Sequence, residues 1–221
     1  MALYLDSFNF ADWHELMPSN VFHGITTNPL LAKRAGLLYG DIEWHAVIER
    51  AAECGAKELH IQVPHTDASV IEFVAARKAE AAHANLTIVI KIPLTDAGIL
   101  LASNVKALEM PILMTACYHA KQYLVADALK AAFIAPYYGR MDEAGIDAYS
   151  HLCQMHDMAK RNPGSCRILV ASLRNSEQMM ALASAGLDDF TISPALARDL
   201  MDEPLTIEAA NNFAKAAQGD A

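Results

Sequence analysis

Short apolar runs alternate with longer amphipathic segments along almost the whole 221-residue chain. The apolar runs are rich in β-branched residues, which is typical of buried strands, whereas the amphipathic segments are typical of helices that cover a sheet. The pattern predicts eight strands, at residues 3–6, 24–28, 58–63, 87–92, 112–116, 133–137, 167–172 and 189–192. It predicts helices at residues 10–16, 41–54, 67–81, 96–108, 119–131, 142–161, 176–185 and about 206–217.

Strand followed by helix, repeated eight times, is the rhythm of a (β/α)8 TIM barrel. We therefore expect an α/β fold with one barrel domain over residues 1–221 and a terminal helix over 206–217 that packs on its own barrel or on a neighbouring subunit. An open doubly wound sheet is the main alternative, but it usually has fewer strands. No stretch rich in Pro, Gly or Ser divides the chain.

Composition limits the kinds of molecule that the protein is expected to bind and the cellular compartment in which it is expected to work. A hydrophobic content of 53% predicts an ordered globular protein, and a net charge of −9 argues against nucleic acids and anionic membranes as main partners. The four cysteines lack any Cys-x-x-Cys spacing, which favours free thiols in a reducing compartment. With no signal segment and no long apolar stretch recognised, we expect a soluble, cytoplasmic protein.

Lys91 is a lone ammonium group in the apolar run Ile88-Val89-Ile90-Lys91-Ile92. Burial disfavours the charged form and lowers the pKa of a lysine, which leaves a neutral amine able to attack a carbonyl. The alternative is a lysine whose head reaches water at a strand end. Because strand residues alternate in direction, Lys91 shares the inward face with Val89 and lies near the carboxyl end of its strand, where such barrels place active sites.

A polar residue occupies the same place on the other predicted strands. These residues are Asp6, Asn28, Gln62, Thr115, Tyr137 and Ser172, with Ser193 just after the eighth strand. Any one of them could cap a loop, but seven strands that converge on one mouth favour a binding or catalytic site.

Residue type indicates a role for each side chain. Lys91 is the candidate nucleophile that forms a Schiff base with a ketone, and Tyr137 is the candidate acid/base, acting through a water held by Gln62 and Thr115. Asp6 is expected to orient Lys91 or to bind substrate hydroxyls.

Two arginines and a serine follow the sixth and seventh predicted strands. Arg140, Ser172 and Arg174 on adjacent loops would form a phosphate clamp, because guanidinium groups bind phosphate through paired hydrogen bonds. The alternative is a pair of solvated surface arginines. Asn28 offers both a donor and an acceptor to a polyol.

Five motifs, spread in order over nearly the whole chain, resemble the transaldolase family, in its small-subunit branch that includes fructose-6-phosphate aldolase. They are Leu3-Tyr4-Leu5-Asp6, Gly24-Ile25-Thr26-Thr27-Asn28-Pro29, Ile90-Lys91-Ile92-Pro93-Leu94-Thr95, Ala135-Pro136-Tyr137 and Ala171-Ser172. The resemblance implies a Schiff base at Lys91, substrate contacts from Thr26 and Asn28, and dihydroxyacetone chemistry on sugar phosphates without a metal or organic cofactor. It also implies a homo-oligomer, a pentamer or decamer in which the C-terminal helix reaches a neighbour.

Three positions separate the two activities of this family. Transaldolases usually carry Glu, Phe and Asn where this chain has Gln62, Tyr137 and Leu113. The sequence therefore favours an aldolase that reversibly cleaves fructose 6-phosphate, or a similar ketose phosphate, to dihydroxyacetone and glyceraldehyde 3-phosphate. Transaldolase, which passes the dihydroxyacetone unit between sugar phosphates of the pentose phosphate pathway, is the alternative. Tyr138-Gly139-Arg140 departs from the aldolases towards the transaldolase pattern.

More distant alternatives use the same residues differently. Lys91 could hold pyridoxal phosphate, or the barrel could bind phosphosugars without catalysis. The nine histidines do not predict a metal site, because no His pair has the spacing of a helical metal motif. His60 shares the inward face with Gln62 and is expected to be a hydrogen-bonded inner histidine.

Overall fold

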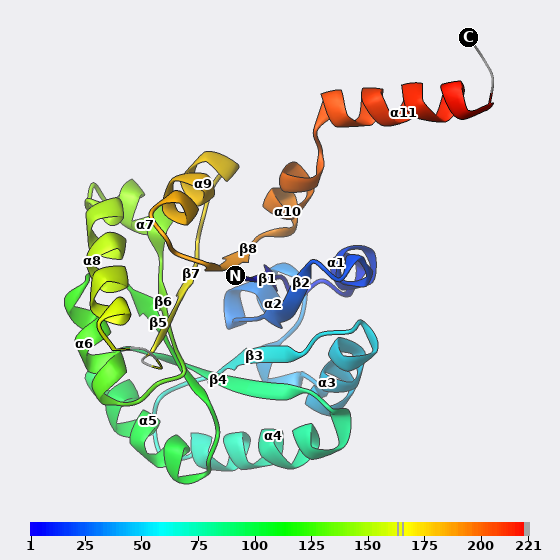
Figure 1. Ribbon diagram of the computed structural model, residues 1–221. Coiled ribbons are helices and arrows are strands. Elements are labelled where there is room, and N and C mark those ends of the chain that lie inside the picture. The colour runs from blue at the N-terminus through cyan, green and yellow to red at the C-terminus, as the bar shows by residue number, and fades with distance from the viewer. Residues whose placement is uncertain (163, 165, 219–221) are drawn as a thin grey trace.

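Eight parallel strands close into a barrel in simple chain order, with helices wrapped around it (Figure 1). The computed structural model describes residues 1–162, 164 and 166–218. The strands are β1 (Ala2–Asp6), β2 (Phe22–Thr26), β3 (Glu58–Gln62), β4 (Thr87–Pro93), β5 (Ile112–Cys117), β6 (Phe133–Pro136), β7 (Arg167–Val170) and β8 (Asp189–Ile192). The predicted (β/α)8 barrel is therefore confirmed.

Helices lie between consecutive strands around the outside of the barrel, and the last two follow β8. They are α1 (Phe10–Leu16), α2 (Pro29–Arg34), α3 (Trp44–Glu53), α4 (Val70–Ala84), α5 (Asp96–Ala107), α6 (Lys121–Ala128), α7 (Tyr138–Glu143), α8 (Ala148–Lys160), α9 (Ser176–Ser184), α10 (Pro194–Met201) and α11 (Pro204–Gln218). Two short 3-10 turns, at Met17–Ser19 and Tyr39–Asp41, complete the connections. No helix in the described part of the chain is long and apolar enough to cross a membrane.

Two helices were not predicted, and one predicted helix was wrong. Residues 142–161 form the end of α7 and the separate helix α8, because Gly145 adopts a left-handed φ of +70° that ends the first helix. The two missed helices, α2 and α10, are short and each begins with a proline directly after a capping residue.

Four strands end earlier than predicted: β3 by one residue, at Gln62, and three others at places that matter for the site. β2 ends at Thr26, because the side chain of Asn28 caps α2 by accepting a 3.0 Å hydrogen bond from the amide of Leu31. β6 ends at Pro136, and Tyr137 keeps only an isolated bridge to Ala171, the residue after β7. β7 ends at Val170, and Ser172 takes a left-handed φ of 64°.

Successive side chains along each strand point in opposite directions, and they form two separate apolar cores. Val89 packs inside the barrel with Tyr4 and Phe133, whereas Ile88 and Ile90 pack in the layer between the barrel and its helices. Since Lys91 follows Val89 by two residues, its side chain also faces the barrel interior.

The amino-terminal half of the barrel interior holds a polar network. Glu58 accepts hydrogen bonds of 2.9 Å from the Tyr4 hydroxyl and from Nε2 of His60, and Arg167 pairs with Asp189 at 2.8 Å. His60 is fully buried, and its Nδ1 has no partner among the described residues. The expected inner histidine is thus hydrogen-bonded on one ring nitrogen only.

Candidate active site

The C-terminal ends of the strands surround a cavity of about 490 Å³. This volume lies within the usual range for small-molecule sites. The cavity is lined by Ser193 and by nine of the ten residues given a catalytic or binding role from the sequence: Asp6, Thr26, Asn28, Lys91, Thr115, Tyr137, Arg140, Ser172 and Arg174. The tenth, Gln62, instead borders a smaller cavity of about 180 Å³ that shares Asn28, Thr115, Tyr137 and Arg140 with the main one.

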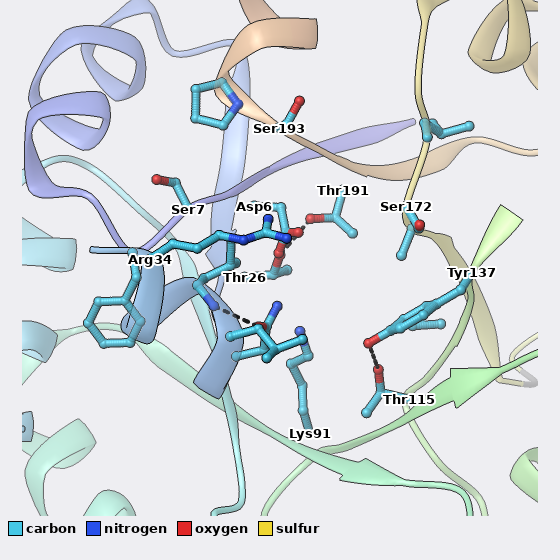
Figure 2. Close-up of a pocket in the computed structure, with 18 of the residues that line it drawn as sticks. Asp6, Ser7, Thr26, Arg34, Lys91, Thr115, Tyr137, Ser172, Thr191 and Ser193 are labelled. Carbon is cyan, nitrogen blue, oxygen red and sulfur yellow. Dashed lines mark hydrogen bonds between the residues drawn. The ribbon is translucent and has the colours of Figure 1, made fainter. Parts of the chain in front are cut away.

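Lys91 is nearly buried, with 4% of its surface exposed, and it extends from β4 into the cavity (Figure 2). Its Nζ donates a 2.8 Å hydrogen bond to the carbonyl of Thr27. Burial lowers the pKa of Lys91, and the negative charge of Asp6 opposes that shift only in part. The amine is therefore more easily deprotonated than that of a solvated lysine, as a nucleophile requires.

Tyr137 and Thr115 form a hydroxyl pair on the β5–β6 side of the cavity, where their oxygens lie 3.0 Å apart (Figure 2). Burial raises the pKa of Tyr137, although the hydrogen bond from Thr115 and the charge of Arg140 act in the other direction. The guanidinium of Arg140 stacks over the phenol ring at 4.8 Å. Tyr137 is thus a protonated phenol at neutral pH, held in place from two sides.

Asp6 belongs to a chain of hydrogen bonds on the cavity wall opposite Tyr137 and Thr115. Thr26 donates to Asp6 at 2.6 Å, and its hydroxyl also lies 2.5 Å from that of Thr191. Thr191 was missed by the sequence reasoning, although it lies on the inward face of β8, two residues before Ser193. The Asp6 carboxylate is thereby oriented without an ion pair to any described cation.

Ser172 offers an unused hydroxyl to the cavity. Its Oγ is buried and has no hydrogen-bond partner among the described residues. Its carbonyl accepts a 3.0 Å bond from the amide of Gly139, and a Cβ at Gly139 would lie only 2.2 Å from that oxygen. Only glycine permits this approach, which brings the segment with Arg140 against the one with Ser172.

The two predicted phosphate-binding arginines differ in their surroundings. Arg140 has no ion-pair partner in the described parts of the chain, whereas Arg174 donates a 2.7 Å hydrogen bond to Glu143. Arg174 is 44% exposed, so this pair is open to solvent and to exchange with a ligand. The structure brings both arginines to one cavity wall, with one of them already paired.

Arg34 and Ser7 also line the cavity, and both escaped the sequence reasoning. Ser7 donates to Asp12 at 2.9 Å and so is engaged within the loop after β1. Arg34 is the last residue of α2, a helix that the sequence pattern did not predict. The residues around Arg34 in the sequence therefore did not indicate that it lies at the mouth of the cavity. Within residues 1–162, 164 and 166–218, no group of three or more His, Cys, Asp or Glu side chains could hold a metal ion.

Solved structures with a similar fold have very different sequences. The chain superposes on a mandelate oxidase variant crystallised with 2-hydroxy-phenylacetamide with a TM-score of 0.59 at 10% identity, covering 88% of this chain and 65% of that one. A second mandelate oxidase variant gives a TM-score of 0.58 at 12% identity, again over 65% of its length. This likeness concerns the barrel fold alone.

Sequence relatives identify the family. The family model described as transaldolase/fructose-6-phosphate aldolase matches residues 3–220. A probable transaldolase of Bartonella henselae is 30% identical over 215 residues, which cover 96% of this chain and 94% of the relative. A probable transaldolase of Phenylobacterium zucineum is 30% identical over 216 residues, with the same coverage. The chain therefore belongs to the transaldolase/fructose-6-phosphate aldolase family, a family of enzymes.

Proposed function

We propose that this protein is a class I aldolase that reversibly cleaves fructose 6-phosphate, or a similar ketose phosphate, to dihydroxyacetone and glyceraldehyde 3-phosphate. The observation that carries the proposal is the buried amine of Lys91 in the same cavity as the protonated phenol of Tyr137. The first group makes a Schiff base, and the second can protonate the enamine that follows.

The first half of the reaction uses Lys91. Its neutral amine attacks carbon 2 of the ketose, and the carbinolamine loses water to give a protonated imine. The bond between carbons 3 and 4 then breaks. Its electrons flow into the imine to form an enamine, and the hydroxyl proton on carbon 4 leaves as the aldehyde forms. Asp6 is the carboxylate in the cavity that can accept this proton, with its orientation set by Thr26.

The second half separates an aldolase from a transaldolase. Protonation of the enamine at carbon 3 returns the imine, whose hydrolysis releases dihydroxyacetone and restores the free amine. Tyr137 supplies this proton, directly or through a water, and Thr115 holds the hydroxyl in position. The border position of Gln62, on the smaller adjoining cavity, supports a role in holding such a water rather than in binding the sugar directly.

The phosphate is proposed to bind where Arg140, Ser172 and Arg174 meet. Arg140 has no ion-pair partner among the described residues, and the buried hydroxyl of Ser172 likewise lacks a hydrogen-bond partner there. Arg174 would join after exchanging Glu143 for the ligand. Asn28 keeps its amide nitrogen for a sugar hydroxyl, because its carbonyl oxygen caps α2.

Transaldolase is the second candidate, and the named relatives favour it. Both relatives described above are called probable transaldolases. In that case the enamine on Lys91 attacks the aldehyde carbon of a second sugar phosphate instead of taking up a proton. The same lysine and the same phosphate site serve both reactions, so the difference rests on Tyr137 and its surroundings.

Borohydride trapping tests the Schiff base. Incubation with dihydroxyacetone or fructose 6-phosphate and borohydride should add one sugar fragment at Lys91, and Lys91→Met should abolish the adduct in intact-mass spectra. An adduct that survives Lys91→Met would contradict the mechanism. Product analysis with and without erythrose 4-phosphate then separates the activities, because cleavage that needs this acceptor identifies a transaldolase.

We also propose a homo-oligomer, a pentamer or decamer by family resemblance. Figure 1 shows α11 extending away from the barrel. Leu205, Ile207 and Phe213 on this helix are exposed, by 73%, 49% and 74%. Large apolar side chains exposed on a helix in this way support contact with a second chain.

A further inference from the structure

Arg140 connects the proposed phosphate site with the proposed proton donor. Its Cζ lies 4.8 Å from the centre of the Tyr137 ring, and the same side chain lines the main cavity, where the substrate phosphate is proposed to bind. The two residues are three positions apart in the sequence, because Tyr137 is the N-cap of α7 and Arg140 lies within that helix. Residues at this spacing are neighbours on a helix surface, so an anion on Arg140 also lies close to the phenol.

The stack on Tyr137 is the one ring or polar contact that the Arg140 guanidinium makes within residues 1–162, 164 and 166–218. The side chain is exposed, and it has neither a hydrogen bond nor an ion pair there, whereas Arg174 is held by Glu143. A cation–π contact at an exposed site is weak, and the conformational entropy of a long side chain opposes it. The guanidinium is therefore poorly fixed when no anion is bound.

Tyr137 depends on its neighbours for a fixed position. It lies just after β6, outside the regular strand. Its hydroxyl lies 3.0 Å from that of Thr115, and the ring of Tyr118 packs against its own ring, with the two centres 5.7 Å apart and the planes at 72°. The guanidinium of Arg140 completes this set of contacts, so a ligand that fixes Arg140 also fixes the phenol.

We propose that Arg140 is a positioning residue through which a bound phosphate orders Tyr137 and accelerates proton transfer to the enamine. This inference rests on the proposed function. A phosphate dianion accepts paired hydrogen bonds from a guanidinium and thereby fixes its plane against the ring. Part of the binding energy of the phosphate then lowers the barrier of the chemical step instead of only tightening binding.

Deuterium exchange into dihydroxyacetone measures this proton transfer by itself. In the imine on Lys91, a hydroxymethyl carbon loses a proton; the electrons of the broken C–H bond form the double bond of the enamine, and the imine π electrons move to nitrogen. The group that protonates the enamine accepts this proton in the reverse direction, exchanges it with D₂O and returns deuterium. Dihydroxyacetone carries no phosphate, so inorganic phosphite can supply the dianion as a separate molecule.

Saturating phosphite should raise the exchange rate of the unaltered protein about tenfold, as expected when a reacting group is better positioned. Arg140→Lys keeps the charge but loses the planar stack, so saturating phosphite should no longer accelerate exchange. With fructose 6-phosphate, Arg140→Lys should lower kcat as well as raise KM. Arg50→Lys is the matched control, because Arg50 stacks in the same way over Phe10, at 4.5 Å and away from the cavity, and it should keep the acceleration.

Exchange that phosphite leaves unchanged in the unaltered protein would overturn the inference and leave the proposed function standing. Full acceleration in Arg140→Lys would also overturn it, since the charge alone would then be sufficient. So would slower exchange with phosphite, because the charge of Arg140 lowers the pKa of Tyr137 and a dianion that only cancelled this charge would make the phenol a weaker acid. A complete absence of exchange, with and without phosphite, would contradict the proposed function and this inference with it.

Discussion

The hydroxyl of Tyr137 lies 3.0 Å from that of Thr115, on the neighbouring strand β5 of the barrel. The pair joins a phenol whose pKa is raised by burial to a hydroxyl that fixes its direction. At neutral pH the phenol retains its proton and can give it to a carbanion equivalent in the cavity.

Replacing Tyr137 by Phe should move the enzyme from cleavage towards transfer. Without the phenol, enamine protonation should slow by about a hundredfold, the lower end for one general acid, while transfer to erythrose 4-phosphate should fall much less. The ratio of the two rates measures the change. Thr115→Ser keeps the hydroxyl pair and serves as the matched control, and equal losses in both reactions of Tyr137→Phe would contradict the role given to the phenol.

Replacing Ser172 by Ala should weaken phosphate binding and leave the fold at least as stable. The Ser172 hydroxyl is buried without a hydrogen-bond partner in the described structure, so its removal should raise the free energy of unfolding by about 1 kcal/mol. The KM for fructose 6-phosphate should rise about tenfold, because a charge-assisted hydrogen bond is lost. Chemical denaturation measures the predicted change in stability, and steady-state kinetics measures the predicted change in KM. An unchanged KM would remove Ser172 from the phosphate site.

His60 should make the barrel sensitive to mild acid. Burial lowers the pKa of His60 from 6.5 to about 4, although Glu58 opposes that shift. Between these two values the unfolded chain binds a proton that the native one does not, so stability falls as the pH drops from 6.5 towards 4, by about 1.4 kcal/mol per unit.

Denaturation at several pH values measures this effect. His60→Phe, which keeps a ring beside Tyr4 and Phe133 but cannot bind a proton, should flatten the slope between pH 6.5 and 4. Glu58 affects stability in a lower pH range. Its hydrogen bond with His60 helps to hold its pKa at about 2, against the effect of burial, so the stability that Glu58 contributes is lost only as the pH falls below 4.5. A slope in His60→Phe as steep as in the unaltered protein would assign the acid sensitivity to other groups.

Phe213 should mark the subunit contact, if α11 reaches a neighbouring chain. Its ring is 74% exposed on α11, and Phe213→Asp should shift the mass in solution, measured by light scattering, towards that of one chain. Asn212→Asp adds the same charge at the preceding exposed position and should leave the mass unchanged. A single-chain mass for the unaltered protein would contradict the oligomer.

Local pattern was enough for the strands and for the direction of Lys91. Alternation in 87–92 is a property of neighbouring residues, and it correctly put Val89 inside and Ile88 and Ile90 outside. The same pattern failed where a strand passes into a turn. The pattern placed Asn28 and Ser172 at strand ends. In the structure Asn28 caps α2, and Ser172 has a left-handed backbone conformation.

The sequence by itself determined the barrel, the family motifs and the ring of polar groups at its mouth, because these depend on spacing along the chain. Only the tertiary structure decided how those groups are engaged. Arg174 is paired with Glu143, which lies 31 residues earlier, and Ser172 is left without a partner among the described residues. Arg34 lines the cavity from the end of α2. Such contacts join loops that are distant in sequence, and closure of the barrel alone brings them together.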